Sequence, residues 1–315
     1  MRLLIVADSL EGGLGAAVAS QSAFFEAAGW AVATFTDLPR SARSAVGMAR
    51  AGSGLHALAR RFRPDVTHCH GLRSFMAARA FARPFVTLHG SGPVPSDPRA
   101  YDALRRAGRR IVPRLAAGAF TATPDGDGWR FLPHASPRLA SLAEQPWPEG
   151  PPTFLWLGRL DEPKQPEVFV QAMAAIADTG ARGLVAGTGP RRDDVARAVR
   201  QLAAPVDLLG QRDDVAELLA RCWAVALFST HEALSFAVQE AMWTGRTAVG
   251  SDLPGLRWLG ADTVADVRGA AAALRKLCDP ERARGLGVAA AGAIRQKLRP
   301  DDPWPAVLAA YDQGR

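Results

Sequence analysis

Two glutamates stand out in the stretch THEALSFAVQEAMWTG, residues 230–245, where Glu232 precedes an apolar run and Glu240 lies inside it. If a helix begins near Ser235, the free N–H groups of its first turn, those of Ser235 and Phe236, can bind an anion. One carboxylate would then accept hydrogen bonds from the hydroxyls of a sugar and the other from a ribose, with a diphosphate between them. The alternative is an N-terminal charge followed by an exposed helical glutamate, but this fits poorly with the apolar neighbours of Glu240.

Two cations follow a predicted strand in FLWLGRLDEPKQPEVFVQAM, residues 154–173. The strand ends at Gly158, Arg159 comes next, and Lys164 opens the following helix. Two cations beside the free N–H groups of a helix can offset the charge of a diphosphate. Lys164 is also unusual because only three of the 38 basic residues are lysines. The alternative is a pair of solvent-exposed cations that bind no ligand.

Histidines mark the ends of two further predicted strands. His89 stands at the carboxyl end of the strand in FVTLHGSG, residues 85–92, where α/β proteins place their reactive groups. In DVTHCHG, residues 65–71, His68 and His70 share one face of a strand by alternation. Two histidines and a cysteine can bind a metal, but no third ligand has a recognisable spacing, so we predict no metal site.

A glycine-rich turn follows the first predicted strand in ADSLEGGLGAAV, residues 7–18. Together with Asp37, about 22 residues after Gly15, it superficially matches a dinucleotide-binding fingerprint, but the third glycine is missing. We expect a turn that faces a ligand, with a purely structural turn as the alternative. The DGDG sequence at 125–128 resembles a carboxylate pair for a metal-bound nucleotide, yet its glycines indicate a surface turn.

Strands and helices that alternate along the chain would position these residues. Short apolar runs predict strands at 2–7, 31–35, 65–68, 84–88, 118–122, 153–157, 182–186, 205–209, 223–228 and 246–249. Amphipathic stretches predict helices near 15–28, 41–62, 72–82, 98–112, 165–178, 191–202, 213–221 and 235–243. Such alternation builds parallel sheets with right-handed crossovers, in which ligands bind at the carboxyl ends of the strands.

The Pro-rich stretch EQPWPEGPPT, residues 144–153, divides this alternation into two series. We therefore predict an α/β protein with two doubly wound, Rossmann-like parallel-sheet domains and a ligand cleft between them. The domains would span residues 1–145 and 146–300, and residues 301–315 would add a C-terminal helix. A length of 315 residues suits two domains.

The composition narrows the class of protein. The chain is 48% hydrophobic and 22% charged, which is ordinary for a globular protein. Its three cysteines are scattered and suggest no disulfide framework, so we expect a reducing compartment, the cytoplasm. No apolar run approaches 18 residues, and the first strand is too short for the apolar region of a signal peptide.

The net charge of +7 is unevenly spread. Residues 40–114 contain fifteen arginines and three acidic residues, and RAYDALRRAGRRIVPRL, residues 99–115, is the densest part. Such a stretch can attract an anionic lipid, a nucleic acid or a phosphorylated acceptor. A solvated basic face is the alternative. We expect an anionic acceptor or membrane surface as the partner, and no nucleic acid.

In combination and in this order, the motifs resemble those of the retaining GT-B glycosyltransferases of glycosyltransferase family 4, the group 1 glycosyl transferases. The resemblance covers nearly the whole chain and is strongest over residues 153–260. It rests on GRLDEPK, where the family has G-R-x-x-x-x-K, on GTGP, and on EALSFAVQEAMWTG, in which seven residues separate two glutamates. EGGLG, DVTHCHG and VTLHG resemble the N-terminal motifs of the family in the same order.

The resemblance implies an enzyme that moves a hexosyl group from a nucleotide diphosphate sugar to an acceptor and retains the anomeric configuration. Arg159 and Lys164 would bind the diphosphate and stabilise the leaving nucleotide. Glu232 would contact the hydroxyls of the donor sugar, and Glu240 would contact the ribose. His89 would contact the sugar near its reacting carbon.

The resemblance also assigns the domains. The N-terminal domain would bind the acceptor, and Gly12 and Gly13 would lie near the phosphate and the acceptor. The C-terminal domain would bind the nucleotide sugar, and the tail helix would return to the N-terminal domain. We expect no cofactor and no metal, because no carboxylate cluster is placed beside the phosphates. The base, the sugar and the acceptor stay open, with a lipid-linked or saccharide acceptor among the candidates and the inner face of a membrane as a location.

Some residues depart from the pattern of the family. Ala233 follows the first glutamate where a glycine is common, and Arg257 in LPGLRWLG stands where a glutamate is common. LPHAS at 132–136 replaces the usual Pro-Asn-Gly. These departures favour two alternatives, a nucleotide-sugar-binding protein that has lost catalysis and a sugar-nucleotide epimerase on the same fold. An NAD-dependent enzyme is a third alternative, which the broken glycine fingerprint opposes.

Overall fold

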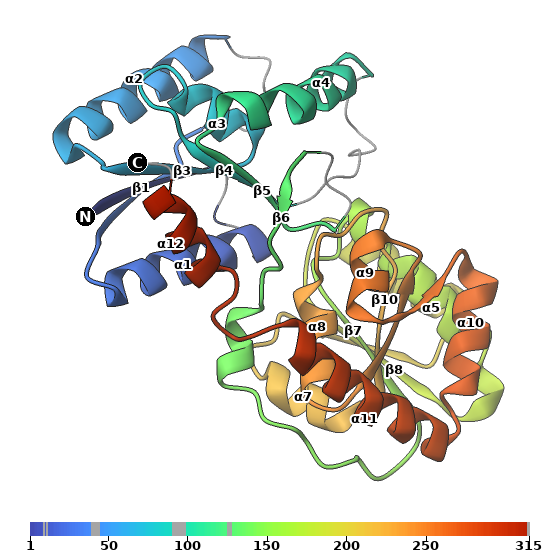
Figure 1. Cartoon of the computed structure of the whole chain (residues 1–315). Coiled ribbons are helices and arrows are strands. Elements are labelled where there is room, and N and C mark those ends of the chain that lie inside the picture. The colour runs from blue at the N-terminus through green and yellow to red at the C-terminus, as the bar shows by residue number, and fades with distance from the viewer. Residues whose placement is uncertain (9, 11, 39–44, 90–98, 125–127, 314–315) are drawn as a thin grey trace. The chain divides into compact units, whose positions relative to one another are not determined.

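The computed structural model describes residues 1–8, 10, 12–38, 45–89, 99–124 and 128–313 of the chain. The chain forms two compact units, each with its own sheet (Figure 1). Unit 1 comprises Met1–Pro137 and Asp301–Arg315, and unit 2 comprises Arg138–Pro300. The cleft expected between the two domains stays a prediction. Among the described residues, no helix combines the length and the apolar character needed to cross a lipid bilayer.

Unit 1 contains a six-stranded parallel sheet in the order β2-β1-β3-β4-β5-β6. Its strands are β1 (Arg2–Ala7), β2 (Ala31–Phe35), β3 (Val66–His70), β4 (Phe85–Leu88), β5 (Gly118–Thr121) and β6 (Arg130–Phe131). The apolar sequence of β1 is buried at every position but the first, because helices cover a central parallel strand on both faces. The strand order reverses between β1 and β3, and ligands of such sheets bind at the carboxyl ends there.

Helices cover both faces of this sheet. They are α1 (Gly12–Ala27), α2 (Ala45–Phe62), α3 (Leu72–Ala78), α4 (Arg99–Leu115) and α12 (Trp304–Gln313). Successive residues of β1 point to opposite faces. Leu3 and Ile5 therefore lie in one core cluster with side chains of α1 and α12, whereas Leu4 and Val6 lie in another with side chains of α2, α3 and α4. The tail helix α12 is thus a part of the core of unit 1.

Unit 2 contains a second six-stranded parallel sheet, in the order β12-β11-β10-β7-β8-β9. Its strands are β7 (Thr153–Leu157), β8 (Arg182–Ala186), β9 (Val206–Gly210), β10 (Ala224–Leu227), β11 (Thr247–Ser251) and β12 (Asp262–Val264). Numbered along the chain of this unit alone, the order is that of a Rossmann sheet. The reversal lies between β7 and β10, so the loops after these two strands are where a ligand is expected.

Seven α-helices and three short 3-10 helices accompany the described strands of unit 2. The α-helices are α5 (Pro166–Ala174), α6 (Arg192–Gln201), α7 (Val215–Arg221), α8 (Phe236–Trp243), α9 (Pro254–Leu259), α10 (Val267–Lys276) and α11 (Pro280–Lys297). The 3-10 helices are η1 (Pro137–Ala140), which begins at the last residue of unit 1, η2 (Glu162–Lys164) and η3 (Ala177–Thr179).

The unit boundary after Pro137 lies several residues before the predicted boundary at 145. The intervening residues are fastened to unit 2, because the indole N–H of Trp243 donates to the carbonyl oxygen of Leu142 at 3.2 Å. The buried guanidinium of Arg246 also donates to the carbonyl oxygens of Gln145 at 3.3 Å and Pro146 at 2.7 Å. The Pro-rich stretch therefore wraps unit 2 and is not a free linker.

The other differences from the prediction concern short or weakly patterned elements. The prediction lacks β6, β12, α9, α10 and α11. β6 and β12 are too short to show an alternation period, and α11 is rich in Ala, Gly and Arg, which blurs its apolar stripe. Helix α1 begins at Gly12, so Gly12 and Gly13 lie in its first turn and not in the preceding loop. Helix α4 continues past Pro113 instead of ending before it.

Candidate active site

Two residues from different loops of unit 2 form an ion pair at the reversal of the strand order. Lys164 follows β7, and Glu232 follows the neighbouring strand β10. Lys164 Nζ donates to Oε1 of Glu232, and Ser229 Oγ donates to the same oxygen at 2.9 Å. The Glu232 side chain is only 9% exposed, so its charge is balanced by Lys164 and its orientation is restricted by Ser229. Two residues that the sequence predicted separately are thus in direct contact.

Asp161 organises the turn that carries the two predicted cations. Its carboxylate caps η2 by accepting the backbone N–H of Lys164 at 3.3 Å, and it also accepts Nε of Arg159 at 2.8 Å. The side chain of Arg159 remains 54% exposed, so an anion in solution can approach its guanidinium. The capping geometry makes GRLDEPK a locally specified turn, because a carboxylate is a preferred helix cap. Asp161 was not predicted as a site residue.

Two glycines let neighbouring loops approach these turns. A Cβ atom on Gly187, in the GTGP turn after β8, would lie 1.8 Å from the carbonyl oxygen of Gly158. A Cβ atom on Gly255 would lie 1.6 Å from the carbonyl oxygen of Ala233, next to Glu232. Any side chain at either position would displace the backbone that carries Arg159 or Glu232. The GTGP turn therefore packs directly against the backbone that precedes Arg159.

Helix α8 begins at Phe236 with Ser235 as its N-cap, and the predicted helix start is confirmed. Ser235 is buried, and its side chain makes no capping hydrogen bond to the first turn. The positive end of the helix dipole follows directly after the loop that holds Glu232. Backbone N–H groups at such an end suit a phosphate oxygen.

Glu240 differs from Glu232 in its surroundings. Its side chain is 1% exposed, and it accepts NH1 of Arg138 at 3.2 Å. Arg138 is the first residue of unit 2, and 102 positions separate it from Glu240. Arg138 donates to Oε1, so the ion pair leaves the predicted contact of Glu240 with a ribose hydroxyl to the other lone pairs of the carboxylate. Arg138 lies outside every predicted element and was not predicted as a site residue.

In unit 1, His89 is joined to other buried polar groups. It follows β4, and its Nε2 lies 2.6 Å from Nδ1 of His70 at the end of β3. Nε2 of His70 lies 2.6 Å from Oε1 of Gln21 on α1. Nε2 of Gln21 donates to the hydroxyl of Tyr311 on α12 at 3.0 Å. The structure thus connects the predicted site residue to three residues to which the sequence assigned no role in the site.

Two more residues continue this group of contacts. Nδ1 of His68 is hydrogen-bonded to the hydroxyl of Tyr311 and lies 3.2 Å from Nε2 of Gln21. Nε2 of His68 lies 2.8 Å from Oγ1 of Thr87 on β4. His68 and His70 do share one face of β3, as the alternation predicted, and their rings stack at 5.0 Å. Besides these two histidines, the sequence offered Gln21 as a signal, because it is an amide within a largely apolar helix.

Burial makes these histidines neutral. It lowers the pKa of His68 to about 3, and the pKa values of His70 and His89 fall well below the usual range. Neighbouring imidazoles lower these pKa values further, since a second positive ring nearby is unfavourable. The pKa of His134, whose ring meets that of His89 edge to face at 4.8 Å, falls to about 4 for the same reason, burial.

The glycine-rich turn of unit 1 leads into α1 next to a second ion pair. Gly12 and Gly13 are exposed at the start of α1. Asp8, at the end of β1, accepts Nε of Arg73 at 3.1 Å and the backbone N–H of Ser74 at 3.1 Å. Burial raises the pKa of Asp8, and Arg73 opposes this rise. Neither Asp8 nor Arg73 was predicted as a site residue, and only the position of Asp8 at a strand end pointed to it.

Several predicted features lie outside the described residues. They are the first three residues of the DGDG motif at 125–128 and the glycines that follow His89. Within the part of the chain that the structure describes, no group of three or more His, Cys, Asp or Glu side chains is arranged to hold a metal ion.

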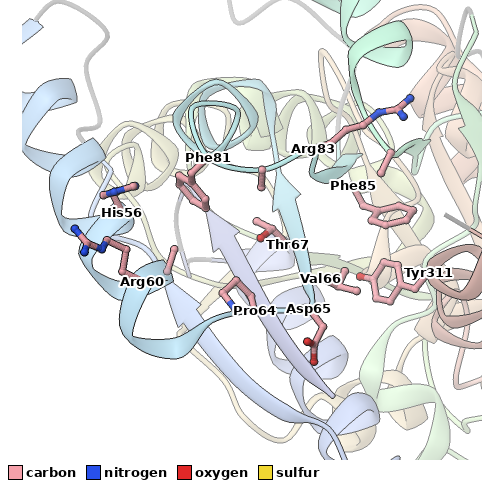
Figure 2. Close-up of a pocket in the computed structure, with 13 residues that line it drawn as sticks. His56, Arg60, Pro64, Asp65, Val66, Thr67, Phe81, Arg83, Phe85 and Tyr311 are labelled. Carbon is pink, nitrogen blue, oxygen red and sulfur yellow. The ribbon is translucent and has the colours of Figure 1, made fainter. Parts of the chain in front are cut away.

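A pocket of about 380 Å³ lies at the other end of the sheet of unit 1 (Figure 2). Its walls include Val66 and Phe85, the first residues of β3 and β4, whereas His70 and His89 stand at the far ends of these strands. In Figure 2 the side chain of Arg60 lies on one side of the pocket and that of Arg83 on the other. The pocket is therefore separate from the predicted site.

Most of unit 2 is similar to a known protein family. Residues 151–279 match the family model described as glycosyl transferases group 1. The matched segment contains Arg159, Lys164, Glu232 and Glu240. A comparison with curated proteins gave no match.

Solved structures resemble the whole chain. Sucrose-phosphate synthase from Thermosynechococcus elongatus has a TM-score of 0.81 at 19% identity, over 100% of this chain and 98% of that chain. A glycosyltransferase from Rickettsia africae has a TM-score of 0.76 at 12% identity, over 99% and 98% of the two chains. HepE from Anabaena in complex with UDP-glucose has a TM-score of 0.72 at 14% identity, over 100% and 98%.

These similarities confirm the predicted fold class. Two six-stranded parallel sheets with surrounding helices match the GT-B structures over the full chain. Because their identities to this chain are low, these structures support the fold alone. The family model supports the chemistry of unit 2. The predicted glycosyltransferase is confirmed at this level: residues 151–279 match the glycosyl transferases group 1 model, in a chain with the GT-B fold.

Proposed function

We propose that this chain transfers a hexosyl group from a nucleoside diphosphate sugar to an acceptor with retention of the anomeric configuration. The observation that carries the proposal is the contact of Lys164 with Glu232. The pair lies at the strand reversal of unit 2, within the matched segment, and directly before the N-terminus of α8. Positive groups for a diphosphate and a carboxylate for sugar hydroxyls therefore come from adjacent loops.

In the proposed reaction, the bond between the anomeric carbon and the diphosphate oxygen breaks. The electron pair stays on the diphosphate, and the positive charge that develops on the sugar is shared with its ring oxygen. An acceptor hydroxyl forms the new bond on the same face, and its proton passes to the departing diphosphate. Lys164, Arg159 and the N–H groups of Ser235 and Phe236 stabilise the negative charge on the leaving group.

Lys164 is suited to act on both parts of the donor. An ammonium group has three N–H donors, and Glu232 occupies one of them in the structure. The remaining donors can reach phosphate oxygens while Glu232 accepts hydroxyls of the sugar. His89 would complete the sugar contacts from unit 1, Gly12 and Gly13 would adjoin the phosphate and the acceptor, and Glu240 would bind the ribose. No metal ion or cofactor is required in this proposal.

The structural relatives suggest the first donor to test. HepE from Anabaena has been solved in complex with UDP-glucose, and it resembles this chain over its full length. A UDP-sugar is therefore our leading candidate, with GDP- and ADP-sugars as alternatives. The location in the cytoplasm stays a prediction.

Nucleotide release from a panel of UDP-, GDP- and ADP-sugars tests the proposal. We expect slow release from one donor without an acceptor, undiminished by EDTA. Lys164→Ala should reduce this release about a hundredfold, because a well-placed donor to the leaving group is worth roughly 3–4 kcal/mol. Lys276→Ala is the matched control, since Lys276 is an exposed lysine of the same unit.

Equal turnover in Lys164→Ala and in Lys276→Ala would remove the assigned role of Lys164. A donor that binds, as a melting-temperature shift would show, but is never cleaved in the presence or absence of candidate acceptors would favour the binding-protein alternative. Conversion of one sugar nucleotide into another would favour the epimerase.

The acceptor side of the proposal rests on helix α4. Its described side chains include exposed Arg110 and Arg114 and two exposed apolar residues, Ile111 at 50% and Leu115 at 40%. Cations interleaved with apolar side chains on one helix are typical of segments that bind an anionic membrane surface. We therefore propose an anionic acceptor, presented at a membrane, as the partner of this helix.

A further inference from the structure

A buried chain of hydrogen bonds ends at His89, and the orientation of the Gln21 amide in the structure sets the direction of each bond. The chain runs from Tyr311 on α12, through Gln21 on α1 and His70 on β3, to His89 after β4. All of these residues belong to unit 1. The proposed transfer mechanism does not use Tyr311, Gln21 or His70, although all three are fully or almost fully buried.

The direction of the chain follows from the amide of Gln21. Its NH₂ group faces the hydroxyl of Tyr311, so its carbonyl oxygen Oε1 faces Nε2 of His70 at 2.6 Å. A carbonyl oxygen accepts only, so Nε2 of His70 must carry a proton. Neutral imidazole has a single ring proton, and Nδ1 of His70 is therefore an acceptor. Nδ1 of His70 lies 2.6 Å from Nε2 of His89. Because Nδ1 of His70 accepts, Nε2 of His89 must carry the proton of this hydrogen bond.

The far end of the chain agrees with this direction. The NH₂ group of Gln21 donates to the oxygen of Tyr311, which leaves the hydroxyl proton of Tyr311 for Nδ1 of His68. His68 then carries its own proton on Nε2 and donates to Oγ1 of Thr87 at 2.8 Å. With the amide of Gln21 in this orientation, each hydrogen bond of the series has one donor and one acceptor. Burial lowers the pKa values of the three histidines, so none of them gains a second proton near neutral pH.

We propose that Tyr311, Gln21 and His70 are positioning residues that hold His89 in the tautomer protonated on Nε2, so that its Nδ1 atom is a hydrogen-bond acceptor. Among the described residues, Nδ1 of His89 has no hydrogen-bond partner. An acceptor at this atom suits a hydroxyl of the transferred sugar, a step that rests on the proposed function. The tautomer itself does not rest on it.

The proposal gives the tail helix a role beyond packing. Tyr311 is 290 positions from Gln21 in the sequence, and its hydroxyl orients the amide that in turn orients His70. Without that hydroxyl, the amide of Gln21 can rotate by half a turn, and every hydrogen bond of the series can then reverse its direction. His89 would then carry its proton on Nδ1 and would present a donor to the sugar.

NMR of the imidazole nitrogens of the full-length chain tests the tautomer directly. The chain has six histidines, so a spectrum of ¹⁵N-histidine-labelled protein is simple, and His89→Asn assigns the signals of His89. We expect a protonated Nε2 and an unprotonated Nδ1 in the wild-type chain. Protonation on Nδ1, or rapid averaging of both tautomers, overturns the inference even if the chain is an active transferase.

Variants link the tautomer to turnover. Tyr311→Phe and Gln21→Leu should each convert the His89 signals to mixed tautomers and lower kcat/KM for the donor about tenfold, the equivalent of one or two hydrogen bonds. Ser20→Ala is the matched control, because it removes a hydrogen bond between the same two helices, from Trp304 to Ser20 at 2.8 Å, outside the chain. It should leave the tautomer and kcat/KM unchanged.

The readouts separate the two proposals. A wild-type chain with the expected tautomer and no transferase activity would contradict the proposed function alone. An active chain whose His89 tautomer survives both Tyr311→Phe and Gln21→Leu would contradict the positioning role alone. If Gln21→Leu does not fold, the wild-type spectrum and Tyr311→Phe still decide the question.

Discussion

At the scale of residues, the buried histidines of unit 1 couple its stability to pH. His68 and His134 have pKa values of about 3 and about 4 in the folded chain, because burial disfavours their charged forms. In the unfolded chain both return to a pKa of about 6.5. The unfolded state therefore binds more protons between these values, so stability is fully present above about pH 6.5 and is lost as the pH falls.

We expect the free energy of unfolding of unit 1 to fall by about 2–3 kcal/mol between about pH 7.5 and about pH 5.5 from these two histidines alone. Urea unfolding followed at several pH values measures this slope. His134→Phe keeps an aromatic ring against Trp304 but cannot bind a proton, so it should reduce the fall by roughly 1 kcal/mol. Parallel pH curves for the two proteins would show that His134 is not responsible.

At the scale of elements, the turn after β8 is predicted to support the turn after β7. Gly187 has a φ of 142°, and a Cβ atom there would lie 1.8 Å from the carbonyl oxygen of Gly158. Gly187→Ala should therefore shift the backbone before Arg159, destabilise unit 2 by roughly 2 kcal/mol or more and lower donor turnover. Urea unfolding and nucleotide release measure the two effects.

Gly285→Ala is the control for this substitution. Gly285 lies within α11, and a Cβ atom there would have no heavy atom within 4 Å. Alanine should be neutral or stabilise the helix by up to about 1 kcal/mol. The supporting role of the GTGP turn is refuted if both alanine variants unfold and turn over like the wild-type chain.

Helix α4 gives a second prediction at this scale. Its exposed arginines and apolar side chains should bind vesicles that contain phosphatidylglycerol and not vesicles of phosphatidylcholine alone. Replacing Arg110 and Arg114 together by serine should weaken the binding by at least tenfold, since each cation contributes roughly 1 kcal/mol near an anionic surface. Vesicle co-sedimentation at low and high salt measures this, because salt screens the attraction.

Serine at Arg282 and Arg284 provides the comparison for α4. These two exposed arginines lie on α11 of unit 2, so their loss changes the net charge equally without touching α4. If both double variants lose vesicle binding to the same extent, only net charge matters and the helix has no specific role. Absence of binding by the wild-type chain would leave a soluble anionic acceptor as the partner to test next.

At the scale of the whole molecule, each unit has its own sheet and its own buried aromatic residues. Trp304 of the tail helix is almost fully buried in the core of unit 1, and Trp156 of β7 is fully buried in unit 2. Trp304→Ala should lower the stability of unit 1 by about 3–5 kcal/mol, because it removes a large side chain from a packed core. Trp156→Ala should do the same to unit 2.

Calorimetry of the two variants tests whether the tail belongs to the core of unit 1. We expect Trp304→Ala to move the unfolding transition of unit 1 to lower temperature and leave that of unit 2 in place, and the reverse for Trp156→Ala. A Trp304→Ala variant in which unit 2 loses as much stability as unit 1 would contradict the assignment of the tail to unit 1.

Much of the sheet architecture could be predicted from sequence because buried parallel strands are continuous apolar runs. The predicted ranges of β1, β2, β7 and β8 agree with the structure at both ends. The start of α8 was predictable from Ser235, whose residue type is common at helix caps. Lys164, Arg159 and Glu232 were predictable because they sit at the ends of such strands, where the spacing along the chain indicates the edge of the sheet.

The contacts between distant segments were decided by the tertiary structure alone. Arg138 meets Glu240 across 102 positions, and Tyr311 meets Gln21 across 290. Periodicity reports the local environment of a residue, and it carries no information about which distant side chain fills the space beside it. The sequence therefore determined the two sheets and the residues at their edges, whereas packing of the tail helix determined the hydrogen-bond chain that ends at His89.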